Sequence, residues 1–171
     1  MMPDSPYFIA KPDPDAARRA ADALFSEVVV ELGRLLPRSA DIRHVGATAV
    51  SGCLTKGDLD IVVRIKPDEF AEAESALAAR YARNTGSFQT DTFASFEDAA
   101  TSPHLGIQLA VMDGPEDFFH LFADALRSDP RLIDKYNALK RTFQGKPMDE
   151  YRQAKGTFVA MVLSAQCEPG R

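Results

Sequence analysis

Two aspartates, Asp58 and Asp60, are the clearest candidates for chemistry in this 171-residue sequence. They open an Ile- and Val-rich stretch, residues 58–65, that predicts a β-strand. Alternate residues of a strand point to the same face, so the two carboxylates are expected side by side, where their like charges raise one pKa. A divalent cation would remove this repulsion, and Mg²⁺ prefers such oxygen ligands, completed by water and substrate phosphates. Asp58 and Asp60 are therefore the predicted metal ligands and catalytic carboxylates. The alternative is two solvated acids at a strand start.

A short turn before this strand supplies further candidates. In the run Gly46-Ala47-Thr48, a glycine at a strand end lets backbone N–H groups approach a phosphate, and the threonine hydroxyl adds a donor. Lys56, two residues before Asp58, is placed to reach a phosphate or a leaving group. Taken singly, these features also fit a tight turn and a surface lysine. Together with the acidic strand they favour a site for a metal and a nucleotide.

Other reactive or aromatic residues give weaker signals. The histidines are not at zinc-ligand spacing and Cys53 has no local partner, so no zinc site is expected. His44 fits a site residue and a hydrogen-bonded strand histidine equally well. Three phenylalanines share a predicted helix with two leucines, which favours a place in the core over a role in stacking on a ligand: Phe118, Phe119 and Phe122.

Composition narrows the class of protein. Apolar residues make up 45% of the chain and charged residues 26%, as in ordinary soluble globular proteins. The net charge of −5 argues against bulk nucleic-acid binding by overall electrostatics. No apolar run approaches the roughly 18 residues that span a bilayer, and the first residues do not resemble a signal peptide. With only two cysteines, Cys53 and Cys167, no disulfide is expected, and a cytoplasmic location is the default.

The elements that must position these residues can be read from hydrophobic periodicity. We expect one domain over residues 1–171, with an α/β (α+β) fold in which a mixed sheet is flanked by helices and the last third is helical. The predicted elements are an extended arm over 1–14, a helix over 15–36, strands over 41–46 and 58–65, a loop or one helical turn over 47–57, a helix from 67 to about 81, a hairpin or two short strands over 86–98, a strand over 105–112, and helices over 115–128, 130–143 and 148–165.

Two sequence runs resemble a known family. The stretch from Val45 to Gly52, followed by Thr55-Lys56-Gly57-Asp58-Leu59-Asp60-Ile61, is similar to the GrpB family within the nucleotidyltransferase superfamily. The runs Tyr136-Asn137-Ala138-Leu139-Lys140 and Tyr151-Arg152-Gln153-Ala154-Lys155 resemble the closing helices of the same family. The resemblance covers residues from about 41 to 160.

The resemblance implies a function and a set of residues. It implies a mixed sheet flanked by helices, with a phosphate-facing turn at Gly46–Thr48 and metal carboxylates at Asp58 and Asp60. Lys140, Tyr151 and Lys155 would line the cleft opposite the carboxylates. The implied activity is Mg²⁺-dependent transfer of a nucleotidyl group from a nucleoside triphosphate to an unknown acceptor.

The sequence departs from the superfamily pattern at two positions that bear on function. The turn has Gly46-Ala47 where the pattern usually has Gly-Ser, and the third carboxylate has no clear match. Active nucleotidyltransferases usually carry a third carboxylate on a neighbouring strand, where it acts as a general base. The matching strand here offers Gln108, and a glutamine is not a useful base at neutral pH. Asp91 and Asp113 are near in sequence but fall in predicted turns. The alternative function is therefore a catalytically inactive protein of the same fold that binds a nucleotide or cofactor.

Overall fold

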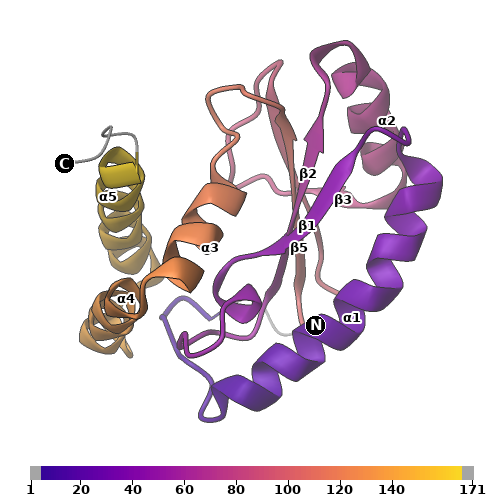
Figure 1. Ribbon diagram of the computed structural model, residues 1–171. Helices are drawn as coiled ribbons and strands as arrows, with labels where there is room; N and C mark the ends of the chain where they lie inside the picture. Colours follow the sequence, from indigo (N-terminus) through magenta and orange to yellow (C-terminus); the bar gives the residue numbers. More distant parts are fainter. Residues whose placement is uncertain (1–4, 167–171) are drawn as a thin grey trace.

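The fold is a mixed five-stranded sheet with helices on both faces (Figure 1). The computed structural model describes residues 5–166. The sheet has the strand order β1-β2-β5-β4-β3, in which β2 and β5 are parallel and the other neighbours antiparallel. Its strands are β1 (Asp41–Val45), β2 (Leu59–Ile65), β3 (Ala82–Arg83), β4 (Phe93–Asp98) and β5 (Leu105–Val111). The predicted mixed sheet is confirmed.

Five α-helices cover the sheet unequally (Figure 1). Two of them, α1 (Pro14–Leu35) and α2 (Phe70–Arg80), pack on one face. On the other side lie α3 (Phe119–Ser128), α4 (Pro130–Phe143) and α5 (Met148–Gln166), which contact one another. Short 3-10 turns, η1 (Ala47–Ala49) and η2 (Pro67–Glu69), follow β1 and β2. The helical last third is thus as predicted.

Side chains along β2 point alternately to the two faces of the sheet, and this alternation separates the main core from the candidate site. Leu59, Ile61 and Val63 are fully buried in the core beneath α1 and α2. Because successive strand residues point to opposite faces, Asp60 and Arg64 lie on the other face, toward the C-terminal helices. The same pattern that builds the core therefore places an aspartate in the space between the sheet and α4–α5.

The N-terminal arm packs against the C-terminal helices. Phe8 is buried, and its ring stacks on Tyr151 with ring centroids 4.1 Å apart. Its backbone N–H donates to the Lys146 carbonyl, and its own carbonyl accepts from the N–H of Gly145. The expected extended arm is therefore fixed against the α4–α5 connection over its described part. Residues 1–4 and Cys167 lie outside the described residues.

Two predicted elements differ from the structure. Within residues 86–98 there is one strand, β4, whose second antiparallel neighbour is the two-residue β3 that follows α2. The helix predicted from residue 115 begins only at Phe119, because Asp117 uses its carboxylate to accept the backbone N–H of Asp113 (2.8 Å) and closes a turn. Asp113 itself has a positive φ of 62°, a conformation that ends regular structure.

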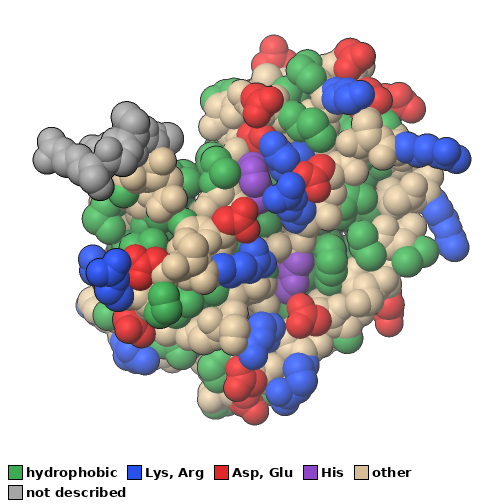
Figure 2. Space-filling model, in the orientation of Figure 1, with side chains coloured by type: hydrophobic (Ala, Val, Ile, Leu, Met, Phe, Trp, Pro, Cys, Tyr) green, Lys and Arg blue, Asp and Glu red, His purple; other side chains and the backbone are tan. Residues whose placement is uncertain are grey.

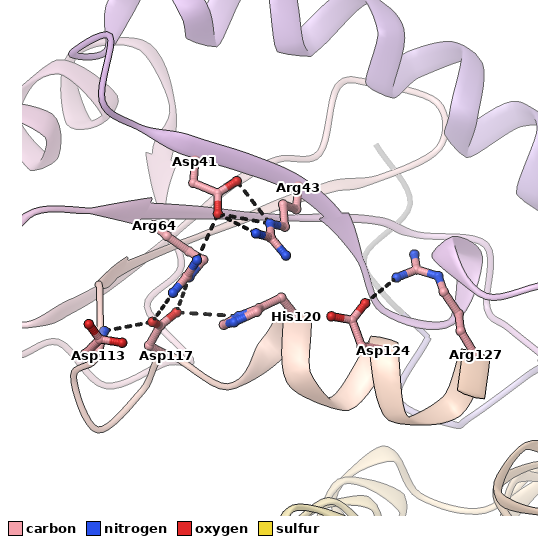
Figure 3. Close-up of polar contacts among 8 residues, drawn as sticks. All are labelled: Asp41, Arg43, Arg64, Asp113, Asp117, His120, Asp124 and Arg127. Carbon is pink, nitrogen blue, oxygen red and sulfur yellow. Dashed lines mark hydrogen bonds and ion pairs between the residues drawn. The ribbon is translucent and has the colours of Figure 1, made fainter. Parts of the chain in front are cut away.

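An ion-pair network holds the start of α3 against the sheet (Figure 3). Arg64 donates to both carboxylate oxygens of Asp117, at 2.6 and 2.7 Å, and also to Asp41 at 2.9 Å. Burial acts to raise the pKa of Asp117, but the hydrogen bonds from Arg64 and from the Asp113 backbone outweigh it and hold that pKa below its ordinary value. The bidentate pair fixes the position of the residues that follow Asp117.

The surface carries both signs of charge. Basic and acidic side chains are interspersed over the face shown in Figure 2, without a continuous basic stripe. None of the helices in residues 5–166 combines the length and the apolar character that a membrane crossing requires.

Candidate functional site

The carboxylate of Asp60 occupies space that two glycines leave free. Gly46 ends β1 with a φ of 77°, and a Cβ there would come within 2.7 Å of Asp60 Oδ2. Gly106 is the partner of Asp60 on β5, and a Cβ there would lie 3.0 Å from Asp60 Oδ1. Real Cβ atoms essentially never approach closer than 3.0 Å. The glycines therefore fix where the carboxylate can sit.

Asp58 lies beside this carboxylate but outside the strand. β2 begins at Leu59, so the prediction that the strand starts at Asp58 is wrong by one residue. Asp58 Oδ2 is 3.3 Å from Lys56 Nζ, and both side chains are about a quarter exposed, at 27% and 26%. The two aspartates and Lys56 line one cavity. The structure thus brings together three of the residues singled out in the sequence.

Asp60 is a carboxylate without a protein partner. It accepts no hydrogen bond and forms no ion pair within the described residues. Burial raises its pKa, Lys155 acts to lower it, and the neighbouring Asp58 raises it again. A half-buried carboxylate without a donor is suited to a cation. Within residues 5–166, no three side chains of the His, Cys, Asp and Glu types gather as a metal cluster. Two neighbouring carboxylates would hold Mg²⁺ only with water and phosphate oxygens completing its shell.

The turn after β1 is fixed by its threonine. Thr48 is buried, and its hydroxyl donates to the backbone carbonyl of Asp58 (2.9 Å) while lying 2.8 Å from His44 Nε2. His44 Nδ1 is 3.2 Å from a carboxylate oxygen of Asp22 on α1. In this structure the Thr48 hydroxyl ties the turn to residue 58, and its donation to a phosphate stays a prediction. Gly46 and Ala47 do line the site cavities.

Helix α4 holds the loop that leads to Asp58. Asn137 accepts from the N–H of Leu54 and donates to the carbonyl of Gly52, both at 2.8 Å. Lys140 is buried, donates to the carbonyl of Leu54, and lies over the Tyr136 ring, 4.0 Å from its centroid. Burial and then the charge of Lys155 lower the pKa of Lys140 to about 7. Lys140 therefore anchors the loop from the wall of the cavity that contains Asp58 and Asp60, and its binding of phosphate stays a prediction.

Helix α5 contributes one buried and one accessible group. Tyr151 is buried between Phe8 and Tyr136, with its hydroxyl 3.5 Å from that of Tyr136. Burial raises the pKa of Tyr151 above its ordinary value. Lys155 lies one helical turn further along, is only half-buried, and makes no ion pair within the described residues. Of the predicted cleft residues, Lys155 is the one whose charge faces Asp60.

Two adjoining cavities meet at Asp60. The first, here called the charged cavity, has a volume of about 50 Å³ and contains Asp58, Asp60, Lys56, Lys140 and Lys155 in its wall. The second, here called the aromatic cavity, has a volume of about 170 Å³ and lies on the side of Gly46, Gln108 and α3. Asp60, Tyr136 and Lys155 belong to the walls of both. A ligand bound at Asp60 therefore has room on both sides.

The candidates for a third carboxylate fall outside the walls of both cavities. Asp91 is exposed in the loop before β4, and Asp113 is exposed in the turn after β5. Gln108 lines the aromatic cavity, as expected for the matching strand position. The sequence did not single out Glu97 of β4. It pairs with Gly106 of β5, which in turn pairs with Asp60 of β2, and its Oε2 lies 3.3 Å from His104 Nε2. This alignment follows from the register of β4 against β5, which the sequence alone does not show.

The fold resembles that of nucleotide-transferring enzymes. Cid1 poly(U) polymerase with Mg and 3'-dATP bound superposes with a TM-score of 0.53 and 13% identity, over 77% of this chain and 42% of that one. A cytoplasmic RNA terminal U-transferase matches with a TM-score of 0.50 and 14% identity, over 74% and 39%. This chain thus spans less than half of these polymerases. It has a nucleotidyltransferase-like fold.

Closer relatives define the family. The family model described as GrpB protein matches residues 14–165, and the chain belongs to the GrpB family. A UPF0157 protein of Vibrio cholerae serotype O1 is 29% identical over 150 residues, which cover 87% of this chain and 79% of that protein. The crystal structure of GrpB from Enterococcus faecalis superposes with a TM-score of 0.69 and 17% identity, over 87% of this chain and 96% of that one.

Proposed function

We propose that this protein transfers a nucleotidyl group from a nucleoside triphosphate to an acceptor, with Mg²⁺ held by Asp58 and Asp60. The observation that carries the proposal is the Asp60 carboxylate, which Gly46 and Gly106 hold in place without a hydrogen-bond donor, next to a second carboxylate. The fold similarity to Cid1 bound to Mg and 3'-dATP supports it. The acceptor is a hydroxyl or amine whose identity the site does not define.

The chain's own groups have separate roles in this reaction. Lys155 and Lys56 line the charged cavity with the two carboxylates and meet the negative charge of the phosphates. Tyr136 and Tyr151 close the cavity wall and limit the access of water. Mg²⁺, when bound, neutralises charge on the phosphates and aligns the displacement. The acceptor oxygen or nitrogen forms a bond to the α-phosphorus, the α–β bridging bond breaks, pyrophosphate leaves with the electron pair, and the acceptor proton passes to solvent.

A second function has a specific observation in its favour. Gln108 stands at the strand position where active nucleotidyltransferases usually carry a third carboxylate, and an amide does not accept a proton near neutral pH. We therefore carry binding of a nucleotide without turnover as the alternative. Phosphoryl chemistry depends largely on positioning and charge neutralisation, so transfer remains the first proposal.

Incubation with α-labelled nucleoside triphosphates, Mg²⁺ and a panel of acceptors separates these functions. We expect label on an acceptor with the wild type, and at least about 100-fold less with Asp60→Asn, which keeps the side-chain shape. Asp68→Asn, an exposed aspartate at the opposite end of β2, is the matched control and should transfer normally. Absence of transfer together with Mg²⁺-dependent calorimetric binding would establish the alternative. Absence of both would refute the site.

A further inference from the structure

The aromatic cavity has the composition of a site for a flat ring. Its apolar wall contains Val45 and Val159 together with four aromatic rings: Phe118, Phe119, Phe122 and Tyr136. Phe118 and Phe119 stack on one another with centroids 4.6 Å apart and an interplanar angle of 17°. Both are half-buried and border the cavity, whereas only Phe122 is buried as the sequence suggested for all three. Stacking on such rings favours planar ligands.

Gln108 brings an uncharged polar group to this cavity. It is half-buried on β5, and its amide makes no hydrogen bond within residues 5–166. Its donors and acceptor are therefore free to bind a ligand in the cavity. An amide offers one acceptor and two donors in one plane. The matching ligand is a ring whose edge carries a donor next to an acceptor.

We propose that the aromatic cavity binds the nucleobase of the nucleotide whose phosphates lie at Asp58, Asp60 and Lys155. The ring lies against Phe118 and Phe119, and Gln108 pairs with its edge. This inference rests on the proposed function for the position of the phosphates. The cavity volume of about 170 Å³ is below the roughly 300 Å³ at which pockets for whole drug-sized ligands begin, so it suits a ring rather than an entire nucleotide.

The geometry connects the two parts of one ligand. Asp60, Tyr136 and Lys155 belong to the walls of both cavities, so a ring in the aromatic cavity places the rest of the molecule in the charged cavity. The aromatic wall is also held in advance of binding. Arg64 binds Asp117 through two hydrogen bonds of 2.6 and 2.7 Å, directly before Phe118 and Phe119. Such preorganisation lowers the entropic cost of binding a ring.

Calorimetry with Mg²⁺ tests the inference by comparing tripolyphosphate with ATP, GTP, CTP and UTP. We expect at least one triphosphate to bind at least about 10-fold more tightly than tripolyphosphate, since stacking is worth about 1–3 kcal/mol per base. Phe119→Ala should remove this advantage and leave tripolyphosphate binding unchanged. Phe119→Leu, which keeps apolar bulk without a ring, should do the same if the alanine variant folds poorly. Val30→Ala on α1 is the control, because Val30 is 52% exposed and absent from the cavity wall, whereas Phe88 stacks on Phe93 and Phe93 stacks on Phe119.

The outcomes separate this inference from the proposed function. Equal affinity for tripolyphosphate and all four triphosphates would overturn the base site and leave the metal and phosphate site standing. An equal loss of both affinities in Phe119→Leu would overturn it as well. Binding of a nucleoside that depends on Phe119, without any binding of tripolyphosphate, would support the base site and contradict the proposed function. Gln108→Leu should alter the order of preference among the four bases.

Discussion

Asp60 Oδ2 lies so close to Gly46 that a Cβ at residue 46 would approach it to 2.7 Å. Gly46→Ala should therefore displace the carboxylate and weaken Mg²⁺-dependent binding of tripolyphosphate by at least about 10-fold. The substitution also places alanine at φ 77° and ψ −174°, a region essentially restricted to glycine, which costs about 1–3 kcal/mol. Calorimetry measures the affinity, and urea unfolding measures the stability.

Gly145 provides the matched control for this substitution. Its φ is 78°, and a Cβ there would meet no atom within 4 Å. Gly145→Ala should lose stability from its own positive φ and keep the affinity for tripolyphosphate. Equal affinities in the two variants would contradict the claim that Gly46 positions Asp60.

Asp60 should reduce stability in the absence of metal. Burial raises its pKa above the unfolded value, so its ionised form is disfavoured in the native state at neutral pH. Asp60→Asn should therefore raise the free energy of unfolding at pH 7. As the pH falls through the folded pKa, the native state binds the proton and the difference should shrink. Urea unfolding at pH 7 and pH 4.5 measures both values, and a destabilised variant at pH 7 would argue against an unpartnered carboxylate.

Lys140 should give the protein a distinct pH dependence. Its folded pKa of about 7 lies well below the 10.5 of an unperturbed lysine, so between these values the unfolded chain holds a proton that the native state has lost. Stability should therefore rise with pH above 7, by at most about 1.4 kcal/mol per pH unit for one proton. Lys140→Met should flatten the wild-type slope between pH 7 and 8.5 in urea titrations. An unchanged slope would mean that Lys140 stays charged in the folded protein.

Thr48 should act through its hydroxyl. Thr48→Val keeps the side-chain shape but loses the hydrogen bond to the Asp58 carbonyl. Because that carbonyl is left without its donor, the free energy of unfolding should fall by about 1–3 kcal/mol. Thr48→Ser keeps the hydroxyl and should retain more of the stability and of the affinity for Mg²⁺ and tripolyphosphate. If the valine variant matches the wild type in both stability and affinity, the hydrogen bond between Thr48 and residue 58 contributes to neither the fold nor the site.

Most of the fold could be predicted because local patterns and core burial agree. The run Leu59-Asp60-Ile61-Val62-Val63 is rich in β-formers and bears its one charge on the face away from the main core. Proline at position 14, with the Asp13 side chain accepting from Ala16 N at 3.0 Å, marks the start of α1 as helix-start rules require. Such signals lie within a few residues of the element that they define.

The features that the sequence did not predict depend on contacts between segments that are distant along the chain. The turn at Asp113–Asp117 needs the position of Arg64, which lies on another strand, so the start of α3 was predicted four residues too early. The sequence predicts that Lys140 faces phosphate, and it could not show that the Lys140 ammonium donates to the carbonyl of Leu54. The helical pattern of Phe118 and Phe119 showed an apolar face without showing that the face borders a cavity.

A crystal of the protein soaked with Mn²⁺ and a non-hydrolysable nucleoside triphosphate tests the central claim most directly. Anomalous scattering at the manganese edge locates the ion independently of the surrounding density. We predict a peak at roughly 2.0–2.3 Å from carboxylate oxygens of both Asp58 and Asp60, with phosphate oxygens completing the shell. A peak bound elsewhere, or nucleotide density that avoids Asp60, would contradict the assignment of these two aspartates as the metal site.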